Sequence, residues 1–234
     1  MTIPAHPGPS VRTFLDEAWM VAEVAGLVWS IPALARQPRG RGEPVVVLPG
    51  FGASDHSTWA LRAYLRGLGY TARGWGLGAN GGDVRALAPR IIEAVVRLAD
   101  QTGERVRLIG WSLGGFIARE VARERPAVIE RVLTLGSPVV GGPKYTAVGH
   151  VYRRRGYDLD AIEAAVAARN RVPITVPVTA IYSRRDAIVS WQACIDEANP
   201  HVEHVEIDAT HLGLGFNAAV YRIVAERLAA ARPG

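Results

Sequence analysis

The sequence predicts an α/β domain in which a mostly parallel sheet of about six strands carries helices on both faces. Short apolar runs rich in valine and isoleucine alternate with longer segments whose apolar residues recur at helical spacing. The apolar runs are continuous, as expected for parallel strands that are buried on both faces. A chain of 234 residues is long enough for one large domain, and it contains no internal repeat.

The predicted strands and helices follow each other in chain order. The strands are residues 45–48, 70–75, 106–109, 131–135, 178–182 and 201–207. The helices are residues 11–29, 58–68, 83–99, 116–125, 158–169, 190–198 and 217–230. Ser57 and Asp83 stand at the start of two of these helices and are suited to cap them.

The chain divides into a short N-terminal part and the α/β domain. Residues 1–42 hold a proline-containing leader and a helix that we expect to cover one edge or face of the domain. The alternative for that helix is contact with a membrane or with entering substrate. Residues 43–234 form the α/β domain. Within it, residues 139–173 interrupt the alternation of strands and helices as a small cap-like insertion.

Composition and charge limit the classes of partner that we expect this protein to bind. The net charge of +5 comes almost wholly from arginine, because Lys144 is the single lysine. The arginines are scattered and match no nucleic-acid motif, so no nucleic-acid partner is expected. Three consecutive arginines, Arg153, Arg154 and Arg155, are a candidate for weak contact with an anionic head group or a membrane surface.

The expected location is the cytoplasm. Cys194 is the single cysteine, so no internal disulfide forms, which favours a reducing compartment. We expect no signal peptide, because the N-terminal residues lack a basic region followed by an apolar core and a cleavage site. The longest uncharged run near the N-terminus, residues 24–35, is too short to span a bilayer, and peripheral membrane association remains compatible with it.

A serine in a strand-to-helix turn is the strongest chemical signal. The pattern Gly-Trp-Ser-Leu-Gly at 110–114 lies between the predicted strand 106–109 and the predicted helix 116–125. Glycine two positions away on each side relieves the crowding of a sharp turn. The turn lifts the Oγ atom of Ser112 clear of the sheet and places it near the positive end of the helix. Ser112 is therefore the predicted nucleophile.

Two later strands end beside an acid and a base. Asp186 follows the strand 178–182, and His211 follows the strand 201–207. In parallel sheets the carboxyl ends of the strands meet at one edge, where reactive groups gather. A serine hydroxyl needs an imidazole to take its proton, and the imidazole needs a carboxylate to fix its tautomer. The order serine, aspartate, histidine is the one this turn architecture uses.

Other residues compete for these two roles. Among the six histidines, His56 is the rival of His211, because it also lies near the expected site. Asp208 is the competitor of Asp186, although its place in the same local loop as His211 favours a role as a turn cap. The alternative for Asp186 is a helix cap or a salt bridge to a neighbouring arginine.

Two backbone amides are expected to stabilise the oxyanion. The N–H of Leu113, just after the serine, supplies one donor. The loop after the first strand, Pro-Gly-Phe-Gly at 49–52, supplies the second, which we assign to the N–H of Phe51. The alternative is that residues 49–52 form only a tight turn.

Four segments together resemble the α/β-hydrolase superfamily. They are Val-Leu-Pro-Gly-Phe-Gly at 47–52, Gly-Trp-Ser-Leu-Gly-Gly at 110–115, Ser-Arg-Arg-Asp-Ala-Ile-Val at 183–189 and Thr-His-Leu-Gly at 210–213. The likeness covers about residues 43–230. Within the superfamily, the chain resembles small bacterial esterases and lipase-like members more specifically. It implies the α/β-hydrolase fold with a minimal cap, Ser112, Asp186 and His211 as a catalytic triad, and the amides of Phe51 and Leu113 as the oxyanion hole.

The chain departs from the family pattern at three places. Members usually begin with an antiparallel hairpin before the strand at Val45, where this chain has a helical pattern. Many members have a larger insertion than residues 139–173. The first loop has Pro49-Gly50 where many relatives have a His-Gly pair, which weakens the assignment of the second oxyanion donor.

The resemblance implies a serine hydrolase that cleaves carboxylic esters through an acyl-enzyme on Ser112. Trp59, Trp111, Val139 and Leu212 are the expected substrate contacts beside Phe51 and Leu113. A thioesterase, an acyltransferase, an amidase or a phospholipase with the same triad is an alternative, and so is a non-catalytic binding module on the same fold. The sequence has no metal-ligand spacing, no dinucleotide fingerprint and no phosphate loop, so we expect no cofactor and no metal. It leaves the oligomeric state open.

Overall fold

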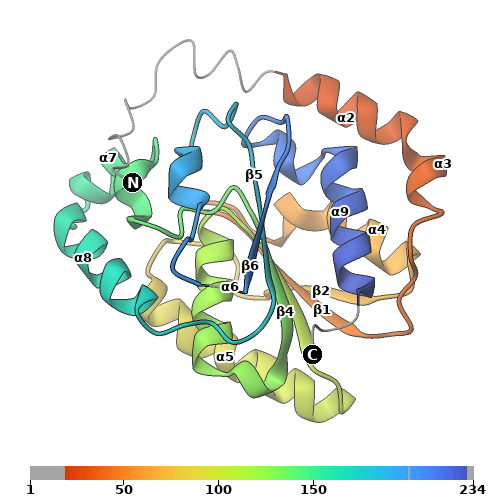
Figure 1. Ribbon diagram of the computed structural model, residues 1–234, viewed down its shortest axis with the longest axis horizontal. Helices are drawn as coiled ribbons and strands as arrows, with labels where there is room; N and C mark the ends of the chain where they lie inside the picture. Colours follow the sequence, from red (N-terminus) through yellow and green to blue (C-terminus); the bar gives the residue numbers. More distant parts are fainter. Residues whose placement is uncertain (1–18, 200, 231–234) are drawn as a thin grey trace.

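The computed structural model describes residues 19–199 and 201–230 (Figure 1). The first half of the predicted helix 11–29 and the leader before it fall outside these residues. The second half forms helix α2, Met20–Trp29, which is followed by the short helix α3, Ile31–Leu34. No helix in the described ranges is both long and apolar enough to cross a membrane.

The sheet has six strands, and all of its neighbours pair in parallel. Its spatial order is β2-β1-β3-β4-β5-β6. The strands are β1 Pro44–Leu48, β2 Thr71–Gly74, β3 Val106–Trp111, β4 Ile129–Leu135, β5 Val178–Tyr182 and β6 Val202–Glu206. The predicted strands and the predicted fold class are therefore confirmed, with the sheet wholly parallel.

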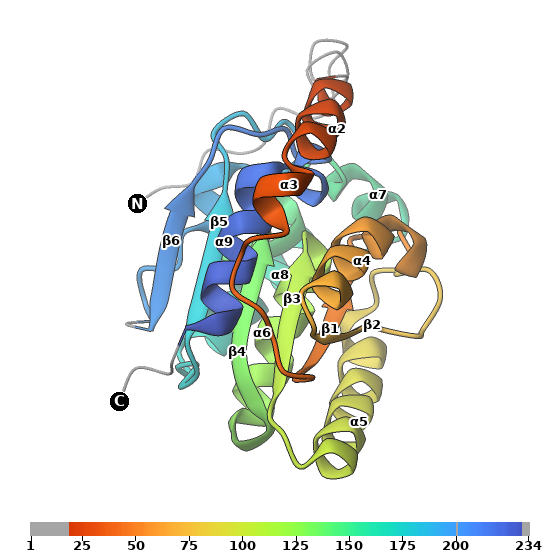
Figure 2. The same cartoon turned by 90° about the vertical axis from the view of Figure 1, so that its right-hand side faces the viewer.

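Two apolar cores lie on opposite faces of the sheet, which explains why the strands read as continuous apolar runs. In β1, Val45 and Val47 pack into one core, and Val46 and Leu48 pack into the other. The first core contains residues of α4, Trp59–Gly67, and α9, Ala218–Ala229. The second contains residues of α5, Val84–Thr102, and α6, Leu113–Glu124. Figure 2 shows these helices on either side of the sheet.

The segment between β4 and β5 carries two more helices. They are α7, Gly149–Arg154, and α8, Leu159–Asn170, and a short 3-10 helix, Gly142–Tyr145, precedes them. Asp158 caps α8, since its carboxylate accepts from the N–H groups of Asp160 and Ala161. These elements lie within residues 139–173, where the alternation of strands and helices predicted from the sequence is interrupted.

One predicted helix is wrong. Residues 190–198 form only a 3-10 turn, Trp191–Cys194, and then leave helical geometry at Ile195. The reason is the side chain of Asp196, which bonds the N–H of Ala198 and pairs with the buried Arg119, so that it holds this segment in a loop. Helix α6 also begins earlier than predicted, at Leu113, directly after the serine.

Candidate active site

Ser112 sits in a strained turn between β3 and α6. Its φ of 53° and ψ of −122° make it the only non-glycine residue with positive φ in the described ranges. A Cβ atom at Gly110 would overlap the backbone of Gly115, and one at Gly114 would overlap the carbonyl of Leu48. Glycine at these positions therefore lets the strand, the turn and the helix pack closely enough to hold the serine in this conformation.

Asp186 and His211 form a hydrogen-bonded pair beyond the ends of β5 and β6. The Nδ1 atom of His211 lies 2.6 Å from Oδ2 of Asp186, and both side chains are buried. The other carboxylate oxygen accepts from the N–H groups of Ile188 and Val189 at 2.9 and 2.7 Å. Because three contacts fix the carboxylate, it favours the tautomer of His211 in which Nδ1 carries the proton.

Ser112 and His211 both lie beside the end of β4. The N–H of Ser112 donates to the carbonyl of Leu135 at 2.7 Å. The next residue, Gly136, has a φ of 54°, and a Cβ there would lie 3.1 Å from Nδ1 of His211 and 2.9 Å from Oδ2 of Asp186. Trp111, which precedes the serine, donates from Nε1 to the backbone carbonyl of His211 at 3.2 Å. The three predicted residues therefore gather at one edge of the sheet.

The rival residues lie in other surroundings. Asp208 has a largely exposed side chain and pairs with Arg185. Arg184 pairs with Glu206, so neither arginine beside Asp186 bonds its carboxylate. His56 is exposed in a short 3-10 helix.

The loop after β1 lies against the serine and is fixed by a residue that the sequence analysis missed. A Cβ at Gly50 would lie 3.9 Å from Oγ of Ser112, so the Gly50-Phe51 peptide borders the nucleophile. Asn80 is fully buried, and its Nδ2 donates to the carbonyl of Pro49 at 2.9 Å. Its backbone also accepts from Gly52 and donates to Ala53, both at 2.8 Å. Its place in a glycine-rich loop was the only signal for this role.

The loop that carries His211 is tied to helix α2 through Glu23, a second residue that the sequence analysis missed. The Glu23 carboxylate accepts from the backbone N–H of Thr210 at 3.1 Å and from its Oγ1 at 2.8 Å. A Cβ at Gly213 would overlap this carboxylate, so glycine is required for the approach. The signal was that Glu23 is the single charged residue in an otherwise apolar stretch from Ala18 to Ala35.

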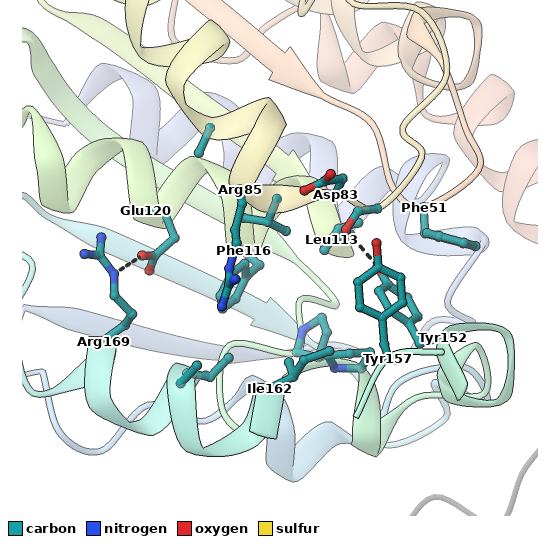
Figure 3. A pocket seen from close by; sticks show the side chains of 18 of the residues that line it. Phe51, Asp83, Arg85, Leu113, Phe116, Glu120, Tyr152, Tyr157, Ile162 and Arg169 are labelled. Carbon is teal, nitrogen blue, oxygen red and sulfur yellow. Dashed lines mark hydrogen bonds and ion pairs between the residues drawn. The ribbon is translucent and has the colours of Figure 1, made fainter. Parts of the chain in front are cut away.

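A cavity of about 1210 Å³ opens beside Ser112 and runs between α5, α6 and α8. Figure 3 shows Phe51, Tyr152 and Tyr157 toward one end and the ion pair of Glu120 and Arg169 at the other. Leu113 and Phe51, the residues of the predicted oxyanion hole, line this cavity. Phe116 and Ile162, which the sequence analysis did not single out, line it as well.

The four other predicted substrate contacts are not among the residues that line this cavity. Trp111 is buried beneath the turn, where its indole bonds the His211 carbonyl, and Val139 is fully buried in the protein interior. Trp59 and Leu212 are exposed at 61% and 38%. The apolar character of these four residues did not show on which side of the serine the cavity would form. The helices between β4 and β5 determine that position.

Cys194 lies close enough to Asp186 for the carboxylate charge to affect the pKa of its thiol. Burial raises the pKa of its thiol well above the ordinary value, and the Asp186 carboxylate raises it further. The thiol is therefore neutral and is not a nucleophile. Among the described residues, no group of three or more His, Cys, Asp or Glu side chains is arranged to hold a metal ion.

Comparisons with known proteins find the same fold in solved structures. Among solved structures, the metagenome-derived lipolytic enzymes LipS and LipT give a TM-score of 0.61 at 14% identity, over 82% of this chain and 94% of that chain. Est1E from Butyrivibrio proteoclasticus gives a TM-score of 0.59 at 16% identity, over 82% and 89%. A monoacylglycerol lipase from Paleococcus ferrophilus gives 0.57 at 17% identity, over 80% and 96%. These similarities show a shared fold.

No curated protein sequence matches the chain significantly. A family model described as the alpha/beta hydrolase family matches residues 45–229, which is most of the chain and spans the sheet from β1 to the end of α9. The chain belongs to the alpha/beta hydrolase family.

Proposed function

We propose that this protein is a serine hydrolase that cleaves carboxylic esters through an acyl-enzyme on Ser112. The observation that carries the proposal is the 2.6 Å bond between His211 and Asp186 at the edge of the sheet where Ser112 stands in its strained turn. A carboxylate that fixes an imidazole beside a raised serine is the arrangement of a nucleophilic triad.

In the first half of the reaction, Oγ of Ser112 attacks the ester carbonyl carbon while Nε2 of His211 takes the hydroxyl proton. The bond from Oγ to carbon forms, and the carbonyl π electrons move to oxygen. The tetrahedral intermediate then collapses, the bond to the alkoxy oxygen breaks, and that oxygen takes the proton from His211. Asp186 stays ionised and stabilises the imidazolium through the Nδ1 bond.

In the second half, a water molecule replaces the alcohol. His211 takes one proton of the water, and the resulting hydroxide attacks the acyl carbon. The bond between carbon and Oγ breaks, and Ser112 recovers its proton from His211 as the carboxylic acid leaves. The amides of Phe51 and Leu113 donate to the oxyanion in both halves, and one such donor supplies about 10²–10³-fold in turnover.

The cavity beside the serine favours a substrate with an apolar acyl chain, because its wall includes aromatic and aliphatic side chains such as Phe116 and Ile162. Several structural neighbours bear names of lipases and esterases, which supports an ester as the substrate. Thioesterase, acyltransferase, amidase and phospholipase activities use the same triad, and a substrate panel would separate them.

Weak contact with a membrane surface is a further part of the proposal. The best support is α2 and the residues around it, where Trp19, Val28, Trp29 and Ile31 are more than half exposed. Exposed tryptophan and aliphatic side chains favour the interface of a bilayer. Arg155 is a weaker candidate than its sequence suggests, because its guanidinium lies 5.2 Å over the Phe51 ring and bonds the Gly81 carbonyl.

The test of the catalytic proposal is hydrolysis of p-nitrophenyl butyrate by the wild type, Ser112→Ala and Asp186→Asn. Ser112→Ala should abolish turnover and labelling by a fluorophosphonate, and Asp186→Asn should lower kcat by about 10³–10⁴-fold, since the amide favours the wrong tautomer. Ser30→Ala changes the serine at the C-terminal end of α2, whose hydroxyl bonds the Gly26 carbonyl of its own helix, and should behave as wild type. Unchanged turnover in Ser112→Ala, or a folded wild type that neither turns over nor labels, would reject the proposal.

A further inference from the structure

We propose that the groove between α5, α6 and α8 binds the acyl chain of the substrate and selects chains of about eight carbons. This inference rests on the proposed function, because it needs Ser112 to hold the acyl carbon. It identifies Ile162 and Arg169 as residues that determine chain length. The observations are the stripes of side chains that three helices present to the groove and the ion pairs between α6 and α8 at one end of it.

Each helix presents one side to the groove. On α6 the lining residues are Leu113, Phe116, Glu120 and Glu124, three or four positions apart and therefore on one face. On α8 they begin with Ala161 and Ile162, continue with Ala165 and Val166, and end with Arg169. On α5 they include Ala88, Ile92 and Val96. Alanine at several of these places keeps the groove wide enough for a chain to lie between the helices.

The direction of the groove follows from the ion pairs. Arg169, in the last turn of α8, bonds Glu120 at 2.7 Å and Glu124 at 2.6 Å, both in the second half of α6. The first turn of α6 begins directly after Ser112. The groove therefore runs from the nucleophile, at the start of α6, to the charged cluster where α6 and α8 end, and Figure 3 shows this ion pair apart from the aromatic end.

Three charged residues also line the groove. Asp83 and Asp158 are the N-caps of α5 and α8, and their carboxylates accept from backbone N–H groups of their own helices. Arg85, in the first turn of α5, extends toward Phe116 (Figure 3), and because it is exposed its charged group stays hydrated while its stem adds apolar surface. At the far end, in contrast, Glu120 is nearly buried and Arg169 is less than half exposed, so their charges bound the groove itself.

The distance between these ends gives the length of chain. Leu113 and Glu120 are seven residues apart on one helix, which corresponds to about 10 Å along its axis. A saturated chain with carbon–carbon bonds of about 1.5 Å advances by about 1.3 Å per carbon. About eight carbons therefore reach from the serine to Glu120. Methylene groups up to that point leave water for apolar surroundings, whereas further ones meet the ion pair and solvent.

The experiment measures kcat/KM for straight-chain p-nitrophenyl esters of two to sixteen carbons, each below the concentration at which it aggregates. For the wild type, kcat/KM should rise by up to about fourfold per methylene as the chain lengthens, peak near eight carbons, and fall beyond. A flat profile, or one that rises steadily to sixteen, would overturn the inference while the hydrolysis itself upheld the proposed function. Absence of hydrolysis for every ester would reject the proposed function instead.

Two variants move the optimum in opposite directions. Ile162→Trp fills part of the groove and should shift the peak to four carbons or fewer. Arg169→Met keeps a long side chain but removes the charge, so it should shift the peak beyond ten carbons. Glu120 keeps Arg123 as its partner in that variant.

Arg171→Met is the matched control. Arg171 follows α8, is exposed, and is not among the residues that line the groove. It should keep the wild-type chain-length profile, as should Arg169→Lys if charge is the cause. A peak that stays at the wild-type length in both Ile162→Trp and Arg169→Met, with turnover of the acetate ester retained, would show that the acyl chain lies elsewhere.

Discussion

Helices α2 and α8 both border the active edge of the sheet, but they are held there in different ways (Figures 1 and 2). None of the residues of α2 is buried, and its polar tie to the body of the protein runs through Glu23 to Thr210. Helix α8 is held by charges: Arg169 bonds Glu120, and Glu163 bonds both Lys144 and Tyr145.

This difference separates two functions of the site. The polar tie of α2 ends one residue before His211, so we expect it to act on the position of that imidazole. The ties of α8 end on α6 and on the loop before α7, so they set the width and the end of the groove. Changes on the α2 side should therefore alter kcat for every substrate equally, whereas changes on the α8 side should alter the preference among substrates.

The largest expected effect concerns the charges behind the groove on α6. Arg119 and Asp196 form an ion pair with side chains only 2% and 1% exposed. Burial lowers the pKa of Arg119, and the Asp196 carboxylate opposes that shift. Arg119→Met leaves this carboxylate buried without its partner and should lower the free energy of unfolding by about 3–5 kcal/mol.

Unfolding in urea, followed by circular dichroism, measures this change. The double variant Arg119→Met with Asp196→Leu removes both charges and should recover much of the lost stability. If the single variant is as stable as the wild type, α6, on which Arg169 of α8 is anchored, is not itself held by buried charge.

The second prediction tests the α2 side. Glu23→Ala releases Thr210 and should lower kcat by about tenfold, which corresponds to about 1.4 kcal/mol of transition-state stabilisation. KM and the preferred acyl length should stay as in the wild type, because no residue of α2 lines the groove. Glu23→Gln keeps an oxygen acceptor for Thr210 and should restore most of kcat.

Glu104→Ala, which removes an exposed carboxylate after α5, is the control for a general effect of charge. A merely structural role for Glu23 would lower the free energy of unfolding and leave kcat of the folded enzyme unchanged. An altered chain-length profile in Glu23→Ala would show that α2 also shapes the substrate site.

The sequence was enough to predict those features that depend on residues close together in the chain. Ser112 could be found because a strained turn needs Gly110 and Gly114 close by in sequence. Continuous valine runs such as residues 45–48 predict strands covered on both faces, and the two cores confirm the reason. The family model and the topology bear out the predicted fold.

The rest depends on contacts between residues far apart in the chain. Glu23 and Thr210 are separated by 187 positions, and nothing near Glu23 in sequence shows that its carboxylate reaches a loop after the last strand. Asn80 reaches Pro49 across 31 positions for the same reason. The groove could not be predicted because it depends on how α8 lies over α5 and α6. The triad roles and the extent of the N-terminal part and the cap as domains remain predictions.

The smallest expected effect is a dependence of stability on pH, which arises beside the Arg119–Asp196 pair. Nε2 of His204 accepts from the N–H of Asp196 at 2.9 Å. Burial lowers the pKa of His204 below its ordinary value of 6.5, the nearby Arg119 lowers it further, and the carboxylates of Asp196 and Glu197 oppose the shift. In the range between the folded and unfolded pKa values, the unfolded chain therefore binds more protons than the folded protein.

Stability from this group is fully present above about pH 6.5 and is lost as the pH falls through the lowered pKa of the folded protein. Urea unfolding at pH 8, 6.5 and 5 should show a steeper loss for the wild type than for His204→Gln, whose amide oxygen can still accept from Asp196. Because the other histidines are present in both proteins, the difference between the two curves isolates His204. Parallel curves would show that this imidazole takes up its proton equally well in the folded and unfolded states. The region around the Arg119–Asp196 pair would then be no more sensitive to acid than helix α2.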